Sequence, residues 1–132
     1  MRERDERCSI GGLMSEGSEG RAGDQPVLGV ETAGSATVVR LAGELDLYNV
    51  DQVRSAIADA IEAGPSRVVI DLAEVEFMDS TALGVLIEAR AALAEGALRL
   101  AAPQLEIVRA LKVSGLDRHL PVHDSVADAL DA

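Results

Sequence analysis

Two hydroxyl side chains follow an acidic residue near the middle of the chain, in the segment Asp79-Ser80-Thr81. Before this segment, Val68, Val69 and Ile70 form a short β-branched run that is typical of a buried parallel strand. From Leu83 onward, apolar residues recur at helical spacing. Asp, Ser and Thr are favoured at helix starts because their side-chain oxygens accept hydrogen bonds from the first unpaired N–H groups. The pattern therefore predicts a hydroxyl pair at a strand-to-helix junction, where N–H donors and the helix dipole suit a phosphate group.

The same segment carries a family resemblance. Residues 77–86 read FMDSTALGVL, which resembles the F-M-D-S-[ST]-G-L-G signature of the STAS domain of bacterial anti-sigma factor antagonists. A second family element, Gly-x-Leu-Asp, is similar to Gly43-Glu44-Leu45-Asp46, and the spacing between the two elements also resembles the family. The match extends from about Val27 to the end of the chain. Ala82 stands where the family usually has Gly, a change that a helix accommodates well.

The resemblance implies a protein-binding switch without catalysis. In the family, a partner anti-sigma factor serine kinase phosphorylates the first Ser after the Asp, and the unphosphorylated form binds the anti-sigma factor and frees the sigma factor. The family's phosphorylated Ser maps to Ser80, with Thr81 as a minor candidate. The helix start and the Gly43–Asp46 segment would form the docking surface. The implied partner-binding residues are Gly43, Glu44, Leu45, Asp46, Asp79, Ser80, Thr81, Ala82 and Leu83.

Each of these polar residues also has a purely structural interpretation. From local pattern alone, Ser80 is a helix-capping residue that contributes about 1 kcal/mol, and Thr81 is a first-turn residue. Asp79 is either the N-cap itself or a group that positions the Ser80 hydroxyl or a kinase metal ion. Asp46 is a loop residue that caps the next helix. A phosphate on Ser80 would add about −1.5 to −2 charges, which helix N–H groups would partly stabilise and both aspartates would oppose.

The chain offers little for a metal, a cofactor or a catalytic centre. His119 and His123 are four residues apart, but Pro121 prevents a helix that would bring them together, so we expect surface loop histidines and no metal site. The glycines at 11–12 and 17–23 lie in a polar stretch with no preceding strand, so no phosphate-cradling cofactor loop is expected. No G-x-S-x-G nucleophile elbow is present. We therefore predict no cofactor and no enzyme activity.

The composition limits the cellular compartments and the classes of partner that we expect. The 132 residues include 23 acidic and 12 basic side chains, for a net charge of −11. Such a charge repels nucleic acid and anionic membranes, so neither is expected as a partner. The single Cys8 has no intramolecular partner, which indicates a reducing compartment. No signal peptide or long apolar run is evident, and we expect a cytoplasmic protein.

Two regions are expected. Residues 1–26 are rich in Gly, Ser and charged residues, and we predict a disordered extension. A docking arm centred on Ile10 to Met14 is the alternative. Residues 27–132 are predicted to form one STAS domain.

Within the domain, strands and helices alternate. We predict strands at 27–31, 37–41, 68–70, 97–101 and 120–122, with Gly43 breaking the second strand and a turn at 71–77. Helices are expected at 50–63, from 80 until Gly96, from Pro103 to a left-handed cap at Gly115, and at the C-terminus after Asp124-Ser125. The expected apolar stripe of the second helix is Leu83, Leu86, Ile87 and Leu93, with Ala89 and Ala92 between them, and that of the third is Leu105, Val108 and Leu111–Lys112. The order predicts an α/β fold, namely a STAS fold with a single four- to five-stranded mixed sheet and helices mainly on one face.

Two other functions compete with the antagonist. The first is a STAS subunit of another assembly, such as a stressosome or a lipid-transport ATPase complex, without a phospho-switch. The second, from another class, is a small hydrolase or nucleotide-binding enzyme. The absence of catalytic His, Lys or metal spacing argues against the enzyme.

Overall fold

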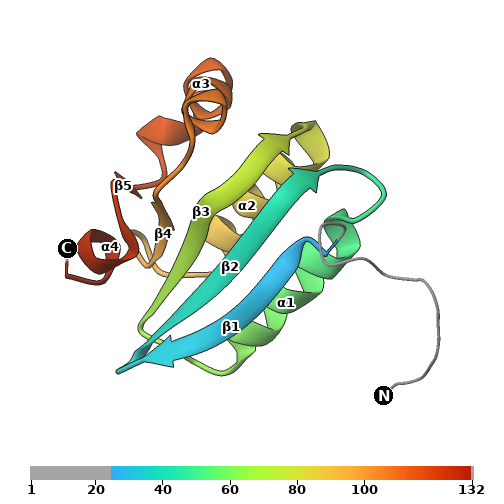
Figure 1. Ribbon diagram of the computed structural model, residues 1–132. Helices are drawn as coiled ribbons and strands as arrows, with labels where there is room; N and C mark the ends of the chain where they lie inside the picture. Colours follow the sequence, from blue (N-terminus) through green and yellow to red (C-terminus); the bar gives the residue numbers. More distant parts are fainter. Residues whose placement is uncertain (1–24, 132) are drawn as a thin grey trace, which may run out of the picture.

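A computed structural model describes residues 25–131 as one mixed sheet with flanking helices (Figure 1). The sheet order is β1-β2-β3-β4-β5, with β1 antiparallel to β2 and all other neighbours parallel. The strands are β1 (Val27–Ala33), β2 (Ala36–Leu45), β3 (Arg67–Met78), β4 (Leu98–Ala101) and β5 (Val122–His123). The helices are α1 (Val50–Glu62), α2 (Ser80–Ala91), α3 (Leu105–Ser114) and α4 (Val126–Asp131), and a 3-10 turn, η3 (Leu116–Arg118), follows α3. The predicted α/β class with a five-stranded mixed sheet is confirmed.

The parallel connections place two helix starts at one edge of the sheet. β2 runs into α1 and β3 runs into α2, so both helices begin beside the carboxyl ends of neighbouring strands. The loop after β2 and the junction after β3 consequently lie side by side.

β1 and β2 are joined by a two-residue turn at Gly34 and Ser35, with Gly34 at a φ of 64°. A positive φ at the first turn position is the reason that glycine is favoured there.

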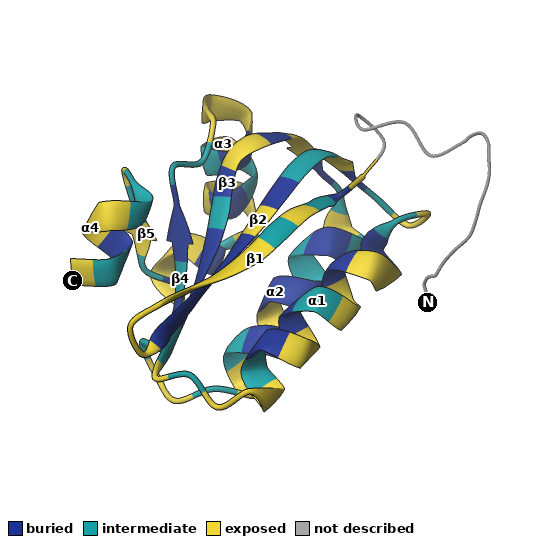
Figure 2. Ribbon diagram, turned by 60° about the horizontal axis from the view of Figure 1, so that its bottom comes forward, coloured by how far each residue is buried: buried dark blue, intermediate teal, exposed yellow. Residues whose placement is uncertain are grey.

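The core lies mainly between one face of the sheet and three helices. It is built from aliphatic side chains and one methionine of β2 and β3, such as Val39 and Ile70, which pack against α1, α2 and α3. A smaller cluster covers the opposite face, where Ala129 of α4 packs on Val38 and Val69. Figure 2 shows α1 and α2 side by side beneath the sheet and α4 apart from them. Three of the four helices thus share one face, as predicted.

Two strands are longer than the sequence pattern indicates. β2 does not end before Gly43 but continues to Leu45, because Gly43 adopts a φ of 78° at an irregularity of the β2–β3 register. A residue with positive φ lets a strand bulge without ending its pairing. The predicted turn at 71–77 is likewise wrong, since β3 continues through it to Met78. The register shifts leave Leu72, Val75 and Met78 buried at intervals of three, which hides the strand period of two.

The predicted apolar stripes of two helices need correction. In α2 the buried residues are Ala82, Val85, Leu86 and Ala89, whereas Ile87 is 51% exposed. The expected stripe correctly includes Leu86 and Ala89 but misses the buried Ala82 and Val85. In α3, which begins at Leu105 and not at Pro103, Ile107 and Leu111 are buried and Leu105 is 66% exposed.

The C-terminal part follows the predicted order with shifted bounds. Gly115 has the expected left-handed conformation, with a φ of 80°. The last strand is Val122–His123 instead of 120–122, so His123 is a partly buried strand residue and not a surface loop histidine. Ser125, and not Asp124, accepts a hydrogen bond from the N–H of Asp128 at the start of α4.

Candidate functional site

Backbone and side-chain contacts join the loop after β2 to the junction between β3 and α2. The N–H of Asp79 donates to the carbonyl of Leu45 at 3.1 Å. In return, the N–H of Leu47 donates to Oδ2 of Asp79 at 3.2 Å. The two segments that the sequence singled out, Gly43–Asp46 and Asp79–Thr81, therefore form one surface.

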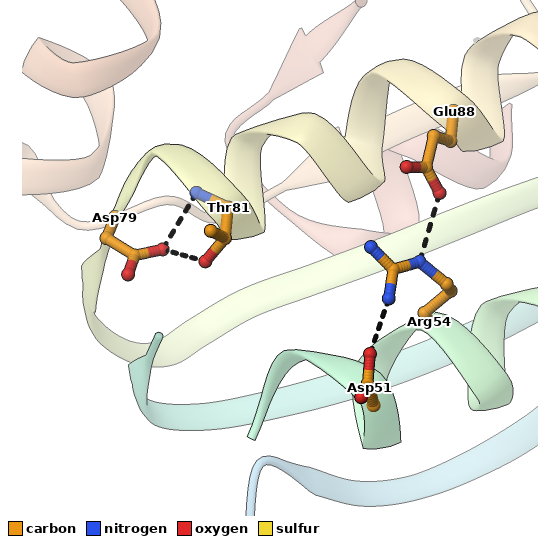
Figure 3. Close-up of polar contacts among 5 residues, drawn as sticks. All are labelled: Asp51, Arg54, Asp79, Thr81 and Glu88. Carbon is orange, nitrogen blue, oxygen red and sulfur yellow. Dashed lines mark hydrogen bonds and ion pairs between the residues drawn. The ribbon is translucent and has the colours of Figure 1, made fainter. Parts of the chain in front are cut away.

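Asp79 is the N-cap of α2. Its Oδ1 accepts hydrogen bonds from the N–H group of Thr81 at 3.0 Å and from the Thr81 hydroxyl at 2.5 Å (Figure 3). The same oxygen also accepts from the N–H of Ala82 at 3.1 Å. The hydrogen bond from the Thr81 hydroxyl lowers the pKa of the Asp79 carboxyl, and the backbone N–H groups of Ala82, Thr81 and Leu47 lower it further. Hydrogen bonds to a carboxylate favour its charged form. Asp79 is accordingly an anion that is held at the first turn of α2.

Ser80 is the more available of the two hydroxyls. Its side chain is exposed, and within residues 25–131 no hydrogen bond involves it, whereas the Thr81 hydroxyl is bound to Asp79. The N–H groups of Thr81 and Ala82 are also occupied by Asp79. A group attached to Ser80 would thus find the helix N-terminus already filled by a carboxylate.

Two hydrogen bonds of the Asn49 side chain fix the loop between β2 and α1. Asn49 accepts from the N–H of Asp46 at 2.9 Å and donates its Nδ2 to the carbonyl of Glu44 at 2.8 Å. The Asp46 carboxylate accepts from the N–H of Tyr48 at 3.0 Å, so it stabilises the turn and does not cap α1. Both ends of the loop are bound, which holds the residues between them at the surface.

The structure sorts the predicted partner-binding residues by exposure. Glu44 and Ser80 are exposed, and five others are partly exposed, namely Gly43, Asp46, Asp79, Thr81 and Leu83. Leu45 is fully buried and Ala82 is 2% exposed. The side chains of both residues pack in the core beneath this surface. The side chain of Ala82, at the position where the family pattern has Gly, faces the core.

Sequence reasoning missed two apolar residues of this surface. Leu47 is 65% exposed and Tyr48 is 92% exposed, in the loop that contacts Asp79. A signal was available, because Tyr48 is the single tyrosine of the chain and stands between Asp46 and the first helical residue, Val50. Exposed aromatic side chains are enriched at the centres of protein interfaces.

The nearby charges are mostly acidic. Arg54 of α1 donates to Glu88 of α2 at 3.1 Å and to Asp51 at 2.5 Å, which ties the two helices together (Figure 3). Its contact with Glu88, and then its attraction to Asp51, raises the pKa of the Arg54 guanidinium. In the part of the chain that the structure describes, neither Asp46 nor Asp79 forms an ion pair.

Residues 25–131 contain no group of three His, Cys, Asp or Glu side chains that could hold a metal ion. No helix within the same range is long and apolar enough to span a bilayer.

Comparison with known proteins agrees with this geometry. The family model of the STAS domain matches residues 28–129, which include both elements of the site. The chain belongs to the STAS domain family. A curated STAS relative, the anti-sigma F factor antagonist of Paenibacillus polymyxa, is 32% identical over 96 residues, which cover 70% of this chain and 82% of the relative.

Solved STAS structures show the same fold. An anti-sigma factor antagonist from Mycobacterium paratuberculosis superimposes with a TM-score of 0.74 at 29% identity, covering 80% of this chain and 90% of the other. The Bacillus cell fate determinant SpoIIAA in its phosphorylated form gives a TM-score of 0.60 at 27% identity, covering 78% of this chain and 96% of the other.

Proposed function

We propose that this STAS domain is an anti-sigma factor antagonist whose binding to an anti-sigma factor serine kinase is switched off by phosphorylation of Ser80. The observation that carries the proposal is the exposed Ser80 hydroxyl at the start of α2, beside the exposed Leu47 and Tyr48. The names of the relatives support the general role of antagonist. The phosphorylated form of SpoIIAA supports a phospho-switch on this fold. In this role the chain is a cytoplasmic binding partner and not an enzyme.

The surface has the composition of a small interface. Leu47 and Tyr48 offer exposed apolar area at its centre, and Ser80, Asp46 and Glu44 surround them with polar groups. Apolar anchors within a polar rim are the usual arrangement of specific protein interfaces. The acidic rim favours a partner whose contact surface is basic.

The geometry supports the proposal that phosphorylation of Ser80 weakens binding to the partner. A phosphate on Ser80 would bring about −1.5 to −2 charges at pH 7 next to the Asp79 carboxylate. Because Asp79 already occupies the N–H groups of Thr81 and Ala82, the phosphate cannot fold back onto them without displacing the cap. It would remain at the surface and repel or obstruct a partner that fits the bare hydroxyl.

The test is phosphorylation by a cognate kinase. The full chain is incubated with each anti-sigma factor serine kinase of its source organism and ATP, and the phosphorylated residue is mapped by mass spectrometry. We expect one phosphate on Ser80, no phosphate on Thr81, and none at all on Ser80→Ala. Thr81→Val is the matched control and should be phosphorylated at the wild-type position.

Binding is measured in parallel by titration calorimetry. The unphosphorylated chain should bind the kinase, and the phosphorylated chain should bind it at least tenfold more weakly. Binding without phosphorylation would refute the switch and leave a STAS subunit of another assembly, such as a stressosome or a lipid-transport ATPase complex, as the better description. Absence of binding to every such kinase would refute the antagonist role itself.

A further inference from the structure

The outer edge of β1 is open in the part of the chain that the structure describes. β1 is the first strand of the sheet order and pairs only with β2 (Figure 1). It is seven residues long, whereas β5 at the other edge has two residues and adjoins α4. An edge strand of this length presents a row of backbone N–H and C=O groups that can pair with another strand.

β1 has few of the usual devices that protect an edge, and its one bulge, at Leu28 between Val27 and Gly29, lies at the start of the strand. Its sequence, VLGVETA, contains no Lys and no Pro. Leu28 is 53% exposed and Val30 is 48% exposed. The one charged residue, Glu31, lies 3.4 Å from the Arg40 guanidinium of β2, so its charge is partly compensated within the same chain. The edge is therefore compatible with a neighbouring strand and does not repel one.

The hairpin determines which backbone groups point outward. In an antiparallel pair with a two-residue turn, the residues that flank the turn form a hydrogen-bonded pair, and inward and outward groups then alternate. Ala33 and Ala36 flank the turn, and the register is regular from there to Gly29. Thr32 and Val30 accordingly direct their N–H and C=O groups away from β2.

We propose that β1 pairs with β1 of a second copy of this chain, antiparallel and about a two-fold axis at Val30. This register places Val30 opposite Val30 of the second copy, both with outward backbone groups. It also places Glu31 opposite Gly29 of the second copy. Gly29 has no side chain, and a Cβ built there meets nothing within 4 Å, so Glu31 faces open space instead of a like charge. From Gly29 to Glu31 the strand is self-complementary in charge in this register, and the bulge at Leu28 lies outside this central stretch.

The pairing leaves the proposed phospho-switch accessible. A two-fold axis through antiparallel β1 strands reverses the strand direction of the second sheet. The two α2 helices therefore start at opposite strand ends of the joined sheet. The inference does not rest on the antagonist function, and either can fail alone. A seven-residue strand pair lies at or below the area of stable dimer interfaces, which is roughly 1,200–2,000 Å². We therefore expect a weak, concentration-dependent dimer. Its rate of formation and its affinity should both increase at higher salt, because each copy carries a net charge of −11 and salt screens the repulsion between copies.

The experiment is sedimentation velocity on the full chain from about 10 μM to about 1 mM, a range that covers weak affinities. The wild-type sedimentation coefficient should rise toward that of a dimer. Val30→Lys, which places two like charges across the axis, should remain monomeric, and so should Val30→Glu. An equimolar mixture of the two variants should associate again, because Lys and Glu then face each other. Leu105→Lys, on the exposed surface of α3, is the matched control and should behave as wild type.

Amide hydrogen exchange provides a second measurement at residue level. The amides of Val30 and Thr32 should become at least threefold better protected as concentration rises, while that of Leu47 should not change. A wild-type chain that stays monomeric throughout the range would overturn the proposal. Association that persists equally in Val30→Lys, or a mixture of Val30→Lys and Val30→Glu that stays monomeric, would overturn the register.

Discussion

At the scale of single residues, Asp79 connects the helix to the loop. One carboxylate oxygen binds two N–H groups and the Thr81 hydroxyl of α2, and the other binds the N–H of Leu47. The cap that starts α2 thus also positions the loop that carries Tyr48. Ser80 is the next residue and takes no part in this network, so its hydroxyl can change chemically without loss of the cap.

Removal of this cap should destabilise the domain in a pH-dependent manner. Asp79→Ala should lower the free energy of unfolding by about 0.5–2 kcal/mol at pH 7, the usual range for an N-cap. The folded-state pKa of Asp79 lies below its usual value, so its contribution is complete above the unfolded pKa of about 3.9 and disappears as pH falls through the lower folded pKa. Urea unfolding at a series of pH values measures the difference between wild type and variant.

Asp79→Asn is the matched control, because an asparagine still caps a helix but does not titrate there. It should retain most of the stability at pH 7. A gap between wild type and Asp79→Ala that is equally large at pH 7 and at pH 3 would contradict the role of the charged carboxylate.

Ser80→Asp should imitate part of the proposed phosphorylation. It adds one negative charge beside Asp79, so the affinity for the proposed kinase partner should fall. The loss should be smaller than after phosphorylation, because a carboxylate carries less charge than a phosphate. Ser80→Ala removes the phosphate acceptor but little surface and should bind as wild type. Both are measured by calorimetric titration, and the melting temperatures of the two variants should stay near that of wild type. Equal affinity of Ser80→Asp and wild type would argue against an electrostatic switch.

The sequence pointed to the polar residues of the candidate site and to Leu83, but not to the exposed Leu47 and Tyr48. The capping preference of Asp79 and the signature around Ser80 are local properties, and the structure bears out the N-cap. The exposure of Tyr48 depends on how Asn49 binds the backbone on both sides of the loop, which a pattern of residue types does not show. The same limit explains why Leu45 and Ala82 were included, since their burial follows from the strand register and from the helix face that meets the sheet.

At the scale of elements, the loop between β2 and α1 holds the most exposed aromatic side chain of the described residues. Tyr48→Ser should weaken binding to the proposed kinase partner by about tenfold or more, the loss that is common at interface hot spots. Stability should hardly change, because a side chain that is 92% exposed contributes little to the core. Surface plasmon resonance measures the affinity, and Val113→Ser, at a residue of α3 that is 90% exposed, is the matched control. Equal binding by Tyr48→Ser and wild type would remove Tyr48 from the proposed interface.

β3 is the element on which the packing of the domain depends. Ile70 is fully buried in it and belongs to the main core cluster. Ile70→Ala should lower the free energy of unfolding by about 2–5 kcal/mol, through lost burial and the cavity that remains. Phe77→Ala on the same strand is the control, because Phe77 is 52% exposed and should cost much less. Chemical denaturation measures both, and equal losses would show that β3 is packed differently.

The extent of β3 shows why some elements could not be predicted in full. Its first part, from Val68 to Ile70, is a continuous β-branched run that indicates a strand by itself. Its second part follows bulges in the pairing with β2, so buried residues recur every third position and resemble a turn or a helix. The second part of β3 is a strand because it pairs with β2, and local periodicity does not reveal pairing between distant segments.

At the scale of the whole molecule, the stability of the fold depends on how the helices pack against the sheet and on the high negative charge. The main core lies between the sheet and α1, α2 and α3, and α4 covers part of the other face. The Arg67 guanidinium donates to the carbonyls of Ala129 and Leu130 and so binds the end of α4 to β3. The ion pairs of Arg40, Arg54 and Arg109 are all at the surface, where such pairs contribute little. Repulsion among the remaining acidic side chains is thus the larger electrostatic effect.

Salt should consequently stabilise the full chain. With a net charge of −11, the compact state repels itself, and a rise in NaCl from about 20 mM to about 300 mM screens that repulsion. We expect the melting temperature at pH 7 to increase over this range and the effect to vanish near the sequence pI of about 4.5. The double variant Glu74→Gln with Glu76→Gln removes two exposed charges of β3 and should reduce the salt dependence. Calorimetry at several salt concentrations provides the measurement, and a melting temperature that falls with added salt would mean that the surface ion pairs outweigh the repulsion.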